Sequence, residues 1–241
     1  MINKVVVSAA GKGTRMLQLT KEKPKHLIKI NDQPFLYYLL NNLYLAGFAQ
    51  IIIIIGYKKE LMEDFLKDYQ DKFNLTIINQ SETLGDKYGT ACPIECVKNK
   101  IQSDESFVSV CGDNLYSVND LKKILIGDDF NYVSGLKHPK PQRYGVLIKN
   151  NQDFLEKIME KPQDYVGDLI NTGLYKFTSS VFEKIPLIEK SPRGEYELTD
   201  VINLLAQEKK VKIKQLEDYW LDLGRLEDIP LLEEFIRNNC L

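Results

Sequence analysis

A run of five isoleucines, Ile51 to Ile55, stops at Gly56 and constrains the fold of this chain more than any other feature. β-branched side chains favour strands, and an apolar run without polar alternation is typical of a strand buried on both faces. A second such run covers residues 4–8 and ends in small residues. Because both runs are far shorter than the about 20 apolar residues that span a bilayer, we expect central strands of a sheet and no membrane segment.

Stretches with helical periodicity separate the strand-like runs of the first half, which is the pattern that produces a parallel sheet covered by helices. Strands are predicted over 4–8, 50–55, 75–78 and 107–111, and helices over 34–46, 60–69 and 88–98. Further strands are predicted over 132–136, 144–148, 154–159, 173–177 and 211–216, with helices over 198–208 and 226–238. We therefore expect an α/β fold with a mixed, mostly parallel central sheet flanked by helices and a second half richer in strands.

No Pro/Ser-rich linker and no internal repeat divides the 241 residues. We expect one domain over 1–241 with two lobes, about 1–130 and about 131–241. The first residues lack the charged, apolar and cleavage regions of a signal peptide, and the four cysteines show neither metal-finger spacing nor a C-x-x-C pair. A cytoplasmic protein with reduced thiols is the expectation.

The charges balance, with 32 Lys and Arg against 34 Asp and Glu, so no global field attracts a nucleic acid or an anionic membrane. An anion must then be bound locally. Behind the first strand, Gly11 and Gly13 let backbone N–H groups approach an anion, and Arg15 and Lys25 add positive charge. By spacing alone this segment could also be a tight turn with solvated charges, because it matches neither the P-loop nor the dinucleotide fingerprint.

The same residues resemble the sugar-1-phosphate nucleotidyltransferases, in which a strand precedes G-x-G-T-R and a later P-K pair. The resemblance implies a Rossmann-like nucleotide-diphospho-sugar transferase fold, with Arg15 and Lys25 as catalytic contacts to a triphosphate. It also implies a nucleotide-binding loop formed by Ala9, Ala10, Gly11, Gly13 and Thr14. His26 departs from the small or apolar residue that is usual after the lysine.

Two later segments follow the family order. Gln80 with Gly89 and Thr90 resembles the segment that reads a pyrimidine base, although the spacer between them is longer than in many members. Gly112 and Asp113 follow a buried strand, and the resemblance makes Gly112 a nucleotide contact and Asp113 a catalytic residue. Asp113 and the distant Asp222 resemble a pair of carboxylates that binds Mg²⁺. Taken alone, either aspartate could be a turn or cap residue.

The sugar side resembles the family in three motifs, Y-G-V, E-K-P and N-T-G. The resemblance implies that Gly145 lets a hexose lie close and that Glu160 binds its hydroxyl groups. Lys161 would face the sugar phosphate, also as a catalytic residue, and Asn171 and Thr172 would close the pocket. Without the resemblance, Glu160 and Lys161 could be an exposed surface pair.

The reaction implied is in-line attack of a hexose 1-phosphate on the α-phosphorus of a nucleoside triphosphate, releasing pyrophosphate. UTP or dTTP and glucose 1-phosphate are the expected substrates, and Mg²⁺ is the expected cofactor. Two alternatives stay open. One is CTP-dependent transfer to a non-sugar phosphate such as phosphocholine, whose choline group would need an aromatic cage or an acidic cluster. The other is a catalytically silent regulatory subunit that binds a nucleotide sugar. A homo-oligomer is also left open.

Overall fold

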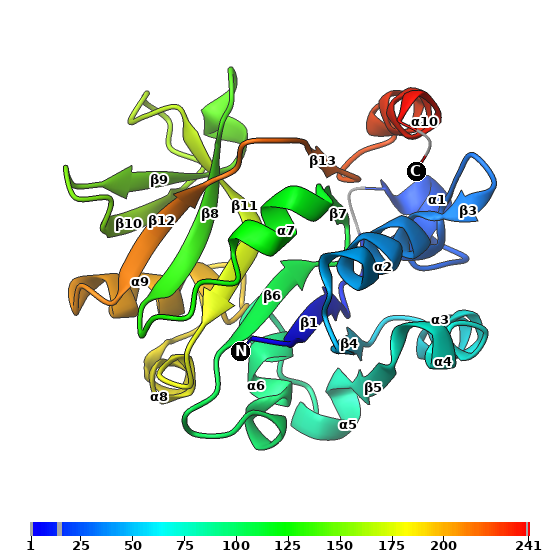
Figure 1. Cartoon of the computed structure of the whole chain (residues 1–241), viewed down its shortest axis with the longest axis horizontal. Helices are drawn as coiled ribbons and strands as arrows, with labels where there is room; N and C mark the ends of the chain where they lie inside the picture. Colours follow the sequence, from blue (N-terminus) through cyan, green and yellow to red (C-terminus); the bar gives the residue numbers. More distant parts are fainter. Residues whose placement is uncertain (1, 14–15, 240) are drawn as a thin grey trace.

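A computed structural model describes residues 2–13, 16–239 and 241 (Figure 1). Within this described part, the central sheet has nine strands, and seven of them follow the order β10-β9-β11-β6-β1-β4-β5. Strand β8 pairs with β11, and β12 pairs with β8. The α/β class is therefore confirmed.

The first half of the chain builds the parallel part of the sheet. β1 (Lys4–Ala9) lies between β4 (Gln50–Ile55) and β6 (Phe107–Cys111), and β5 (Leu75–Asn79) extends the sheet beyond β4. The isoleucines of β4 are all buried, as an uninterrupted β-branched run predicts. The helix α2 (Phe35–Ala46) ends at Gly47, whose φ of 93° gives the left-handed cap that favours glycine.

The second half adds mostly antiparallel strands: β8 (Asn131–Lys137), β9 (Gly145–Lys149), β10 (Leu155–Glu160) and β11 (Leu169–Phe177). β12 (Val211–Gln215) is the exception, because it runs parallel to β8. β11 begins four residues before the predicted range of 173–177, since a register shift between Asn171 and Tyr175 interrupts its pattern. Gly173, with φ of +75°, lies inside this shift.

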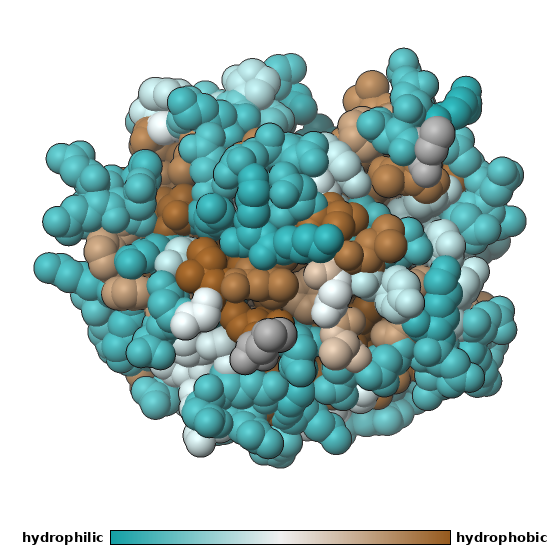
Figure 2. Space-filling view, viewed as in Figure 1, coloured by the Kyte–Doolittle hydropathy of each residue, from teal (hydrophilic) through white to brown (hydrophobic). Residues whose placement is uncertain are grey.

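Helices cover both faces of the sheet, and successive β1 side chains point to opposite sides. Val5 and Val7 belong to the core beneath α2, α7 (Val118–Lys123) and α10 (Asp228–Asn238). Val6 belongs to the second core, beneath α6 (Cys92–Cys96), α8 (Val181–Lys184) and α9 (Leu198–Gln207). Figure 2 shows a largely hydrophilic face with apolar surface gathered beside α7. No helix in the described ranges is long and apolar enough to cross a membrane.

The helix predicted over 88–98 is wrong in its first part, because α6 begins only at Cys92. The preceding residues pair with another segment instead: Tyr196 N–H donates to the Tyr88 carbonyl at 3.0 Å, and Ala91 N–H donates to the Tyr196 carbonyl at 3.0 Å. Gly89 permits this approach with φ of +142°, since a Cβ there would lie 2.2 Å from the Tyr196 carbonyl oxygen.

A two-stranded ribbon outside the main sheet was not predicted. It pairs β7 (Asn114–Tyr116) with β13 (Trp220–Asp222) in antiparallel register. The remaining short elements are α1 (Leu17–Thr20), η2 (Lys25–Leu27), β2 (Lys29–Ile30), β3 (Gln33–Pro34), α3 (Lys59–Lys67), α4 (Gln70–Phe73), α5 (Gln80–Leu84), η3 (Lys98–Lys100), η4 (Pro141–Arg143) and η5 (Ile185–Leu187).

Candidate active site

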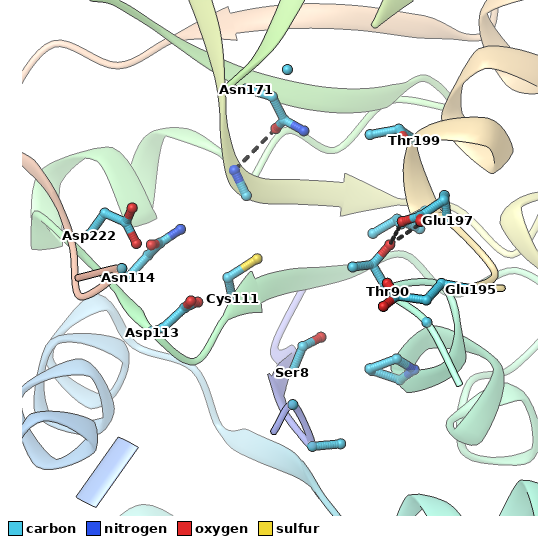
Figure 3. A pocket seen from close by; sticks show the side chains of 18 of the residues that line it. Ser8, Thr90, Cys111, Asp113, Asn114, Asn171, Glu195, Glu197, Thr199 and Asp222 are labelled. Atoms are coloured by element: carbon cyan, nitrogen blue, oxygen red, sulfur yellow. Dashed lines mark hydrogen bonds between the residues drawn. The ribbon is translucent and has the colours of Figure 1, made fainter. Parts of the chain in front are cut away.

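A pocket of about 460 Å³ opens at the carboxyl ends of β1 and β6 and extends along β9 and β11 (Figure 3). Most of the site residues predicted from the sequence line it: Ala10, Gly11, Gly13, Lys25, Gln80, Gly89, Thr90, Asp113, Gly145, Glu160, Lys161, Asn171, Thr172 and Asp222. Ala9 and Gly112 do not line it; a Cβ at Gly112 would lie 3.1 Å from His26 Cδ2 and 3.2 Å from Ala9 Cβ. Thr14 and Arg15 fall outside the described residues.

The glycine loop after β1 reaches the pocket with its backbone. Gly13 adopts φ of +64°, and its carbonyl accepts hydrogen bonds from Met16 N–H at 3.0 Å and Thr20 Oγ1 at 3.1 Å. A Cβ at Gly13 would lie 3.1 Å from Thr20 Cγ2 and 3.5 Å from Lys25 Cβ. Glycine therefore allows the loop to pack tightly beside Lys25.

Lys25 and Asp113 form an ion pair at the floor of the pocket. Burial alone would raise the pKa of the Asp113 carboxyl, but the Lys25 ammonium outweighs it and holds that pKa below its ordinary value. Burial likewise opposes charge on Lys25, yet Asp113 and the more distant Asp222 raise the Lys25 pKa. Both side chains are consequently charged at neutral pH.

The β7–β13 ribbon brings Asp222 beside Asp113. Asp222 is the register partner of Asn114, and Leu223 N–H donates to the Asp113 carbonyl at 2.8 Å. Figure 3 shows both carboxylates on one side of the pocket. Gly224 leaves room for Asp222, because a Cβ there would lie 2.8 Å from Asp222 Oδ2.

The carboxylates of Asp113 and Asp222 are the candidate metal ligands of the pocket. Across the described ranges no three or more His, Cys, Asp and Glu side chains gather closely enough to hold an ion by themselves. Two carboxylate groups on a shared wall fit a hard cation such as Mg²⁺, which takes one or two protein carboxylates and completes its shell with water and substrate phosphates.

In the strand-rich second half of the chain, β9 and β10 place Gly145 opposite Glu160, and both residues line the pocket. A Cβ on Gly145 would lie 3.0 Å from Glu160 Oε1, so the glycine makes space for the carboxylate. Burial raises the pKa of Glu160, while the positive charges of Lys161 and Arg193 oppose this shift. Glu160 is thus an exposed acceptor in the pocket lining, with two cations close to it.

The register shift in β11 presents Asn171 to the pocket. Its Oδ1 accepts from Gly173 N–H at 3.1 Å, and its Nδ2 donates to the Tyr175 hydroxyl at 2.8 Å. Thr172 directs its hydroxyl to the Ser134 carbonyl on β8. The Thr172 carbonyl accepts from three side chains of the β7–β13 ribbon: Asn114 Nδ2 at 3.0 Å, Tyr116 OH at 2.8 Å and Trp220 Nε1 at 3.0 Å.

Gln80, the first residue of α5, is buried and lines the pocket. Its Nε2 donates to the Lys87 carbonyl at 3.2 Å, which fixes the orientation of the amide. Thr90 uses its hydroxyl within the protein: it accepts from Leu198 N–H at 2.8 Å and donates to Glu197 Oε2 at 3.2 Å.

Five charged residues of the pocket lining were not among the predicted site residues: Lys12, Arg143, Arg193, Glu195 and Glu197. The last three of these residues belong to the turn and loop that lead into α9. The S-P-R-G turn signal at 191–194 predicts a loop, but no periodicity shows that this loop faces the site. His26 also lines the pocket; its ring is buried, and its Nδ1 makes no hydrogen bond within the described structure.

An α/β sheet with a phosphate-type glycine loop, a Lys–Asp pair and a second carboxylate at its carboxyl edge defines a nucleotidyltransferase-like enzyme. The chain belongs to the nucleotidyl transferase family, whose model matches residues 4–239.

Known proteins are similar over nearly the whole chain. A bifunctional sugar-1-phosphate nucleotidylyltransferase/acetyltransferase of Sulfurisphaera tokodaii is 35% identical over 239 residues, covering 99% of this chain and 56% of that protein. The UTP–glucose-1-phosphate uridylyltransferase AglF of Haloferax volcanii is 32% identical, covering 92% of each chain. This chain spans about half the length of several bifunctional relatives that it matches.

A solved UDP-glucose pyrophosphorylase in complex with UDP-glucose has the same fold. Its TM-score is 0.84 at 21% identity, and the match covers 99% of this chain and 100% of that one. The expected nucleotide-diphospho-sugar transferase fold is therefore confirmed.

Proposed function

We propose that this protein transfers a nucleotidyl group from a nucleoside triphosphate to a hexose 1-phosphate and releases pyrophosphate. The observation that carries the proposal is one pocket with two differently equipped ends. Lys25, Asp113 and Asp222 form a phosphate-type end, and Glu160 with Lys161 forms an end suited to a sugar phosphate. We assign the first end mainly to the lobe 1–130 and the second to the lobe 131–241.

The phosphate end has to neutralise a polyanion. A phosphate monoester is already a nucleophile near neutral pH, so the chain needs no covalent intermediate and has to align two anions. Lys25 is charged, partly buried and held in place by Asp113, which suits it to contact the α-phosphate as negative charge builds there. The backbone of Gly11 and Gly13 would hold the remaining phosphates. We also assign Arg15 to the triphosphate, to which it would add a second positive charge.

Asp113 and Asp222 would hold Mg²⁺, which supplies charge neutralisation for the phosphates when it is bound. Lys25 contacts one carboxylate oxygen of Asp113, and a carboxylate has further lone pairs for a cation. The Mg²⁺ dependence is part of this proposal.

At the sugar end, Glu160 is placed to accept hydrogen bonds from hexose hydroxyl groups, and Gly145 leaves the wall open beside it. Lys161 and Arg193 flank Glu160 and offer positive charge to the incoming phosphate. Asn171, oriented by Gly173 and Tyr175, would close the pocket over the sugar. The nucleophilic phosphate oxygen would then face the α-phosphorus that Lys25 contacts.

UTP or dTTP and glucose 1-phosphate are the proposed substrates. Gln80 is a fixed amide at the pocket wall whose Oε1 has no partner within the described structure, and an amide can read the edge of a pyrimidine. The similarity to AglF, which is named a UTP–glucose-1-phosphate uridylyltransferase, favours the same pair.

The test is pyrophosphate release with Mg²⁺, using UTP, dTTP, CTP, GTP and ATP against glucose 1-phosphate, other hexose 1-phosphates and phosphocholine. Release with a pyrimidine triphosphate and one hexose 1-phosphate, lost in Asp113→Asn, supports the proposal. Pyrophosphate release with phosphocholine, and with none of the hexose 1-phosphates, would identify phosphocholine as the acceptor substrate instead of a sugar phosphate. No release with any pair, together with binding of a nucleotide sugar, would point to a regulatory subunit.

A further inference from the structure

Arg193 stands at the tip of a hairpin turn on the sugar side of the pocket. Ser191 N–H donates to the Glu195 carbonyl at 2.8 Å, and Gly194 N–H donates to the Ser191 carbonyl at 2.7 Å. Pro192 favours such a turn, and Gly194 supplies the left-handed residue that closes it with φ of +77°. The Arg193 side chain is 58% exposed, so the turn by itself does not fix where the guanidinium points.

A buried carboxylate restrains this arginine. The Glu197 side chain is only 10% exposed, and its Oε1 accepts from Arg193 Nη2 at 2.8 Å and from Ser191 Oγ at 2.9 Å. Its Oε2 accepts from Thr90 Oγ1 at 3.2 Å, as Figure 3 shows. Burying a carboxylate costs free energy unless the group is fully hydrogen-bonded. The three hydrogen bonds to Glu197 meet this requirement, and they suggest that the carboxylate does more than shape the loop.

Capping of α9 does not account for Glu197. The residue occupies the N-cap position, but its side chain makes no capping hydrogen bond. The first amide of the helix, Leu198 N–H, is instead satisfied by Thr90 Oγ1. The carboxylate is directed to the arginine and to two hydroxyls.

The network joins the two ends of the pocket. Thr90 belongs to the segment beside Gln80 that was expected to contact the nucleotide, yet its hydroxyl serves Glu197 and α9. Arg193 lines the same pocket as Glu160 and Lys161, the residues of the proposed sugar-phosphate position. Its positive charge also opposes the rise that burial causes in the pKa of Glu160. A guanidinium has five N–H donors, and one of them bound to Glu197 leaves others for a phosphate.

We propose that Glu197 is a positioning residue that fixes Arg193 for the phosphate of the sugar substrate. The inference rests on the proposed function. When a long, exposed side chain is already held in one geometry, substrate binding does not have to remove its rotamer freedom. Glu197 thus acts on recruitment of the sugar phosphate, through Arg193, and not on the nucleotide.

The experiment measures both KM values of Glu197→Gln, with UTP and glucose 1-phosphate as probes. The KM for glucose 1-phosphate should rise about 10-fold, the effect of losing one charge-assisted hydrogen bond, while the KM for UTP stays within about 2-fold. In the Arg193→Ala background the same change should add nothing, since a residue acting through Arg193 is not additive with its loss. The matched control is Asp128→Asn, because Asp128 also accepts from a lysine, a hydroxyl and a backbone N–H but does not line the pocket.

A rise in the UTP KM, equal rises in both, no change, or an additive effect beside Arg193→Ala would each overturn the inference. If Glu197→Gln fails to fold, Glu197→Asp takes its place. The shorter side chain keeps the buried charge but moves it away from Arg193 by one methylene, so the KM for glucose 1-phosphate should again rise while the KM for UTP does not. Absence of turnover in the wild-type protein with every hexose 1-phosphate would instead contradict the proposed function itself.

Discussion

Lys25 and Asp113 are 88 residues apart in the chain and form an ion pair at the floor of the pocket. Their charges sustain each other: the ammonium keeps the pKa of the carboxyl low, and the carboxylates of Asp113 and Asp222 keep the pKa of the lysine high. A phosphate entering the pocket therefore meets a fully charged lysine that is already oriented, which is the condition for electrostatic stabilisation without reorganisation.

Removal of the lysine charge should affect turnover more than binding. We expect Lys25→Met to lower kcat by roughly 100- to 1,000-fold, as loss of one preorganised contact to a transition state does. Steady-state pyrophosphate release measures this effect. Lys149→Met is the control, because Lys149 pairs with Asp153 on the surface, and its turnover should match the wild type. A Lys25→Met protein with near-normal kcat would remove Lys25 from the reaction.

Metal removal tests the two carboxylates. Chelation with EDTA should abolish pyrophosphate release, and added Mg²⁺ should restore it. In Asp222→Asn, the Mg²⁺ concentration for half-maximal rate should rise by at least the about 10- to 100-fold that loss of an outer-shell partner costs a metal site. An unchanged Mg²⁺ requirement in this variant would exclude Asp222 as a ligand.

The strands that carry the site were predictable because their cause is local. An apolar run such as that of β4 has one physical solution, a strand buried on both faces, and the carboxyl edge of that sheet is where Asp113 lies. The β7–β13 ribbon was not predictable, since three-residue strands have no measurable periodicity and their partners are more than a hundred residues apart. Asp222 was therefore found by resemblance and not by pattern.

Long-range pairing also explains why the helix predicted over 88–98 begins only at Cys92. The segment before Cys92 has helical periodicity, yet its backbone pairs with Tyr196, which no local signal encodes. Tertiary hydrogen bonds outweighed local preference here. The Thr90 hydroxyl is bound to Glu197 and Leu198, and the contact of this pocket residue with a nucleotide stays a prediction.

His26 should make the protein less stable in mild acid. Burial, assisted by the nearby positive charge of Lys25, lowers the pKa of His26 from 6.5 to about 4. Between these values the unfolded chain binds a proton that the folded chain does not, so the free energy of unfolding falls as pH falls. The contribution lost between pH 7 and pH 5 is about 2 kcal/mol.

Urea unfolding of His26→Leu at the two pH values measures this contribution. The variant should lose about 2 kcal/mol less than the wild type on going from pH 7 to pH 5. His138→Gln is the control, since this more exposed imidazole accepts a hydrogen bond from Lys140 N–H at 3.0 Å and should leave most of the slope in place. Equal slopes in the wild type and His26→Leu would show that His26 is not a buried neutral imidazole.

Lys176 on β11 should be a large contributor to stability, although it lies outside the pocket lining. Its side chain is fully buried, and its Nζ donates to the Phe130 carbonyl at 2.6 Å and contacts Asp128. Burial lowers the pKa of Lys176, and the Asp128 carboxylate opposes that shift. Lys176→Met keeps most of the volume but leaves a carboxylate and buried carbonyl oxygens without their donor, so we expect a loss of about 2–4 kcal/mol in the free energy of unfolding. Lys149→Met removes an exposed pair and should cost no more than about 0.5 kcal/mol. Urea unfolding of both variants at neutral pH checks the contrast, and a Lys176→Met protein as stable as Lys149→Met would show that the buried ammonium contributes nothing net to the fold.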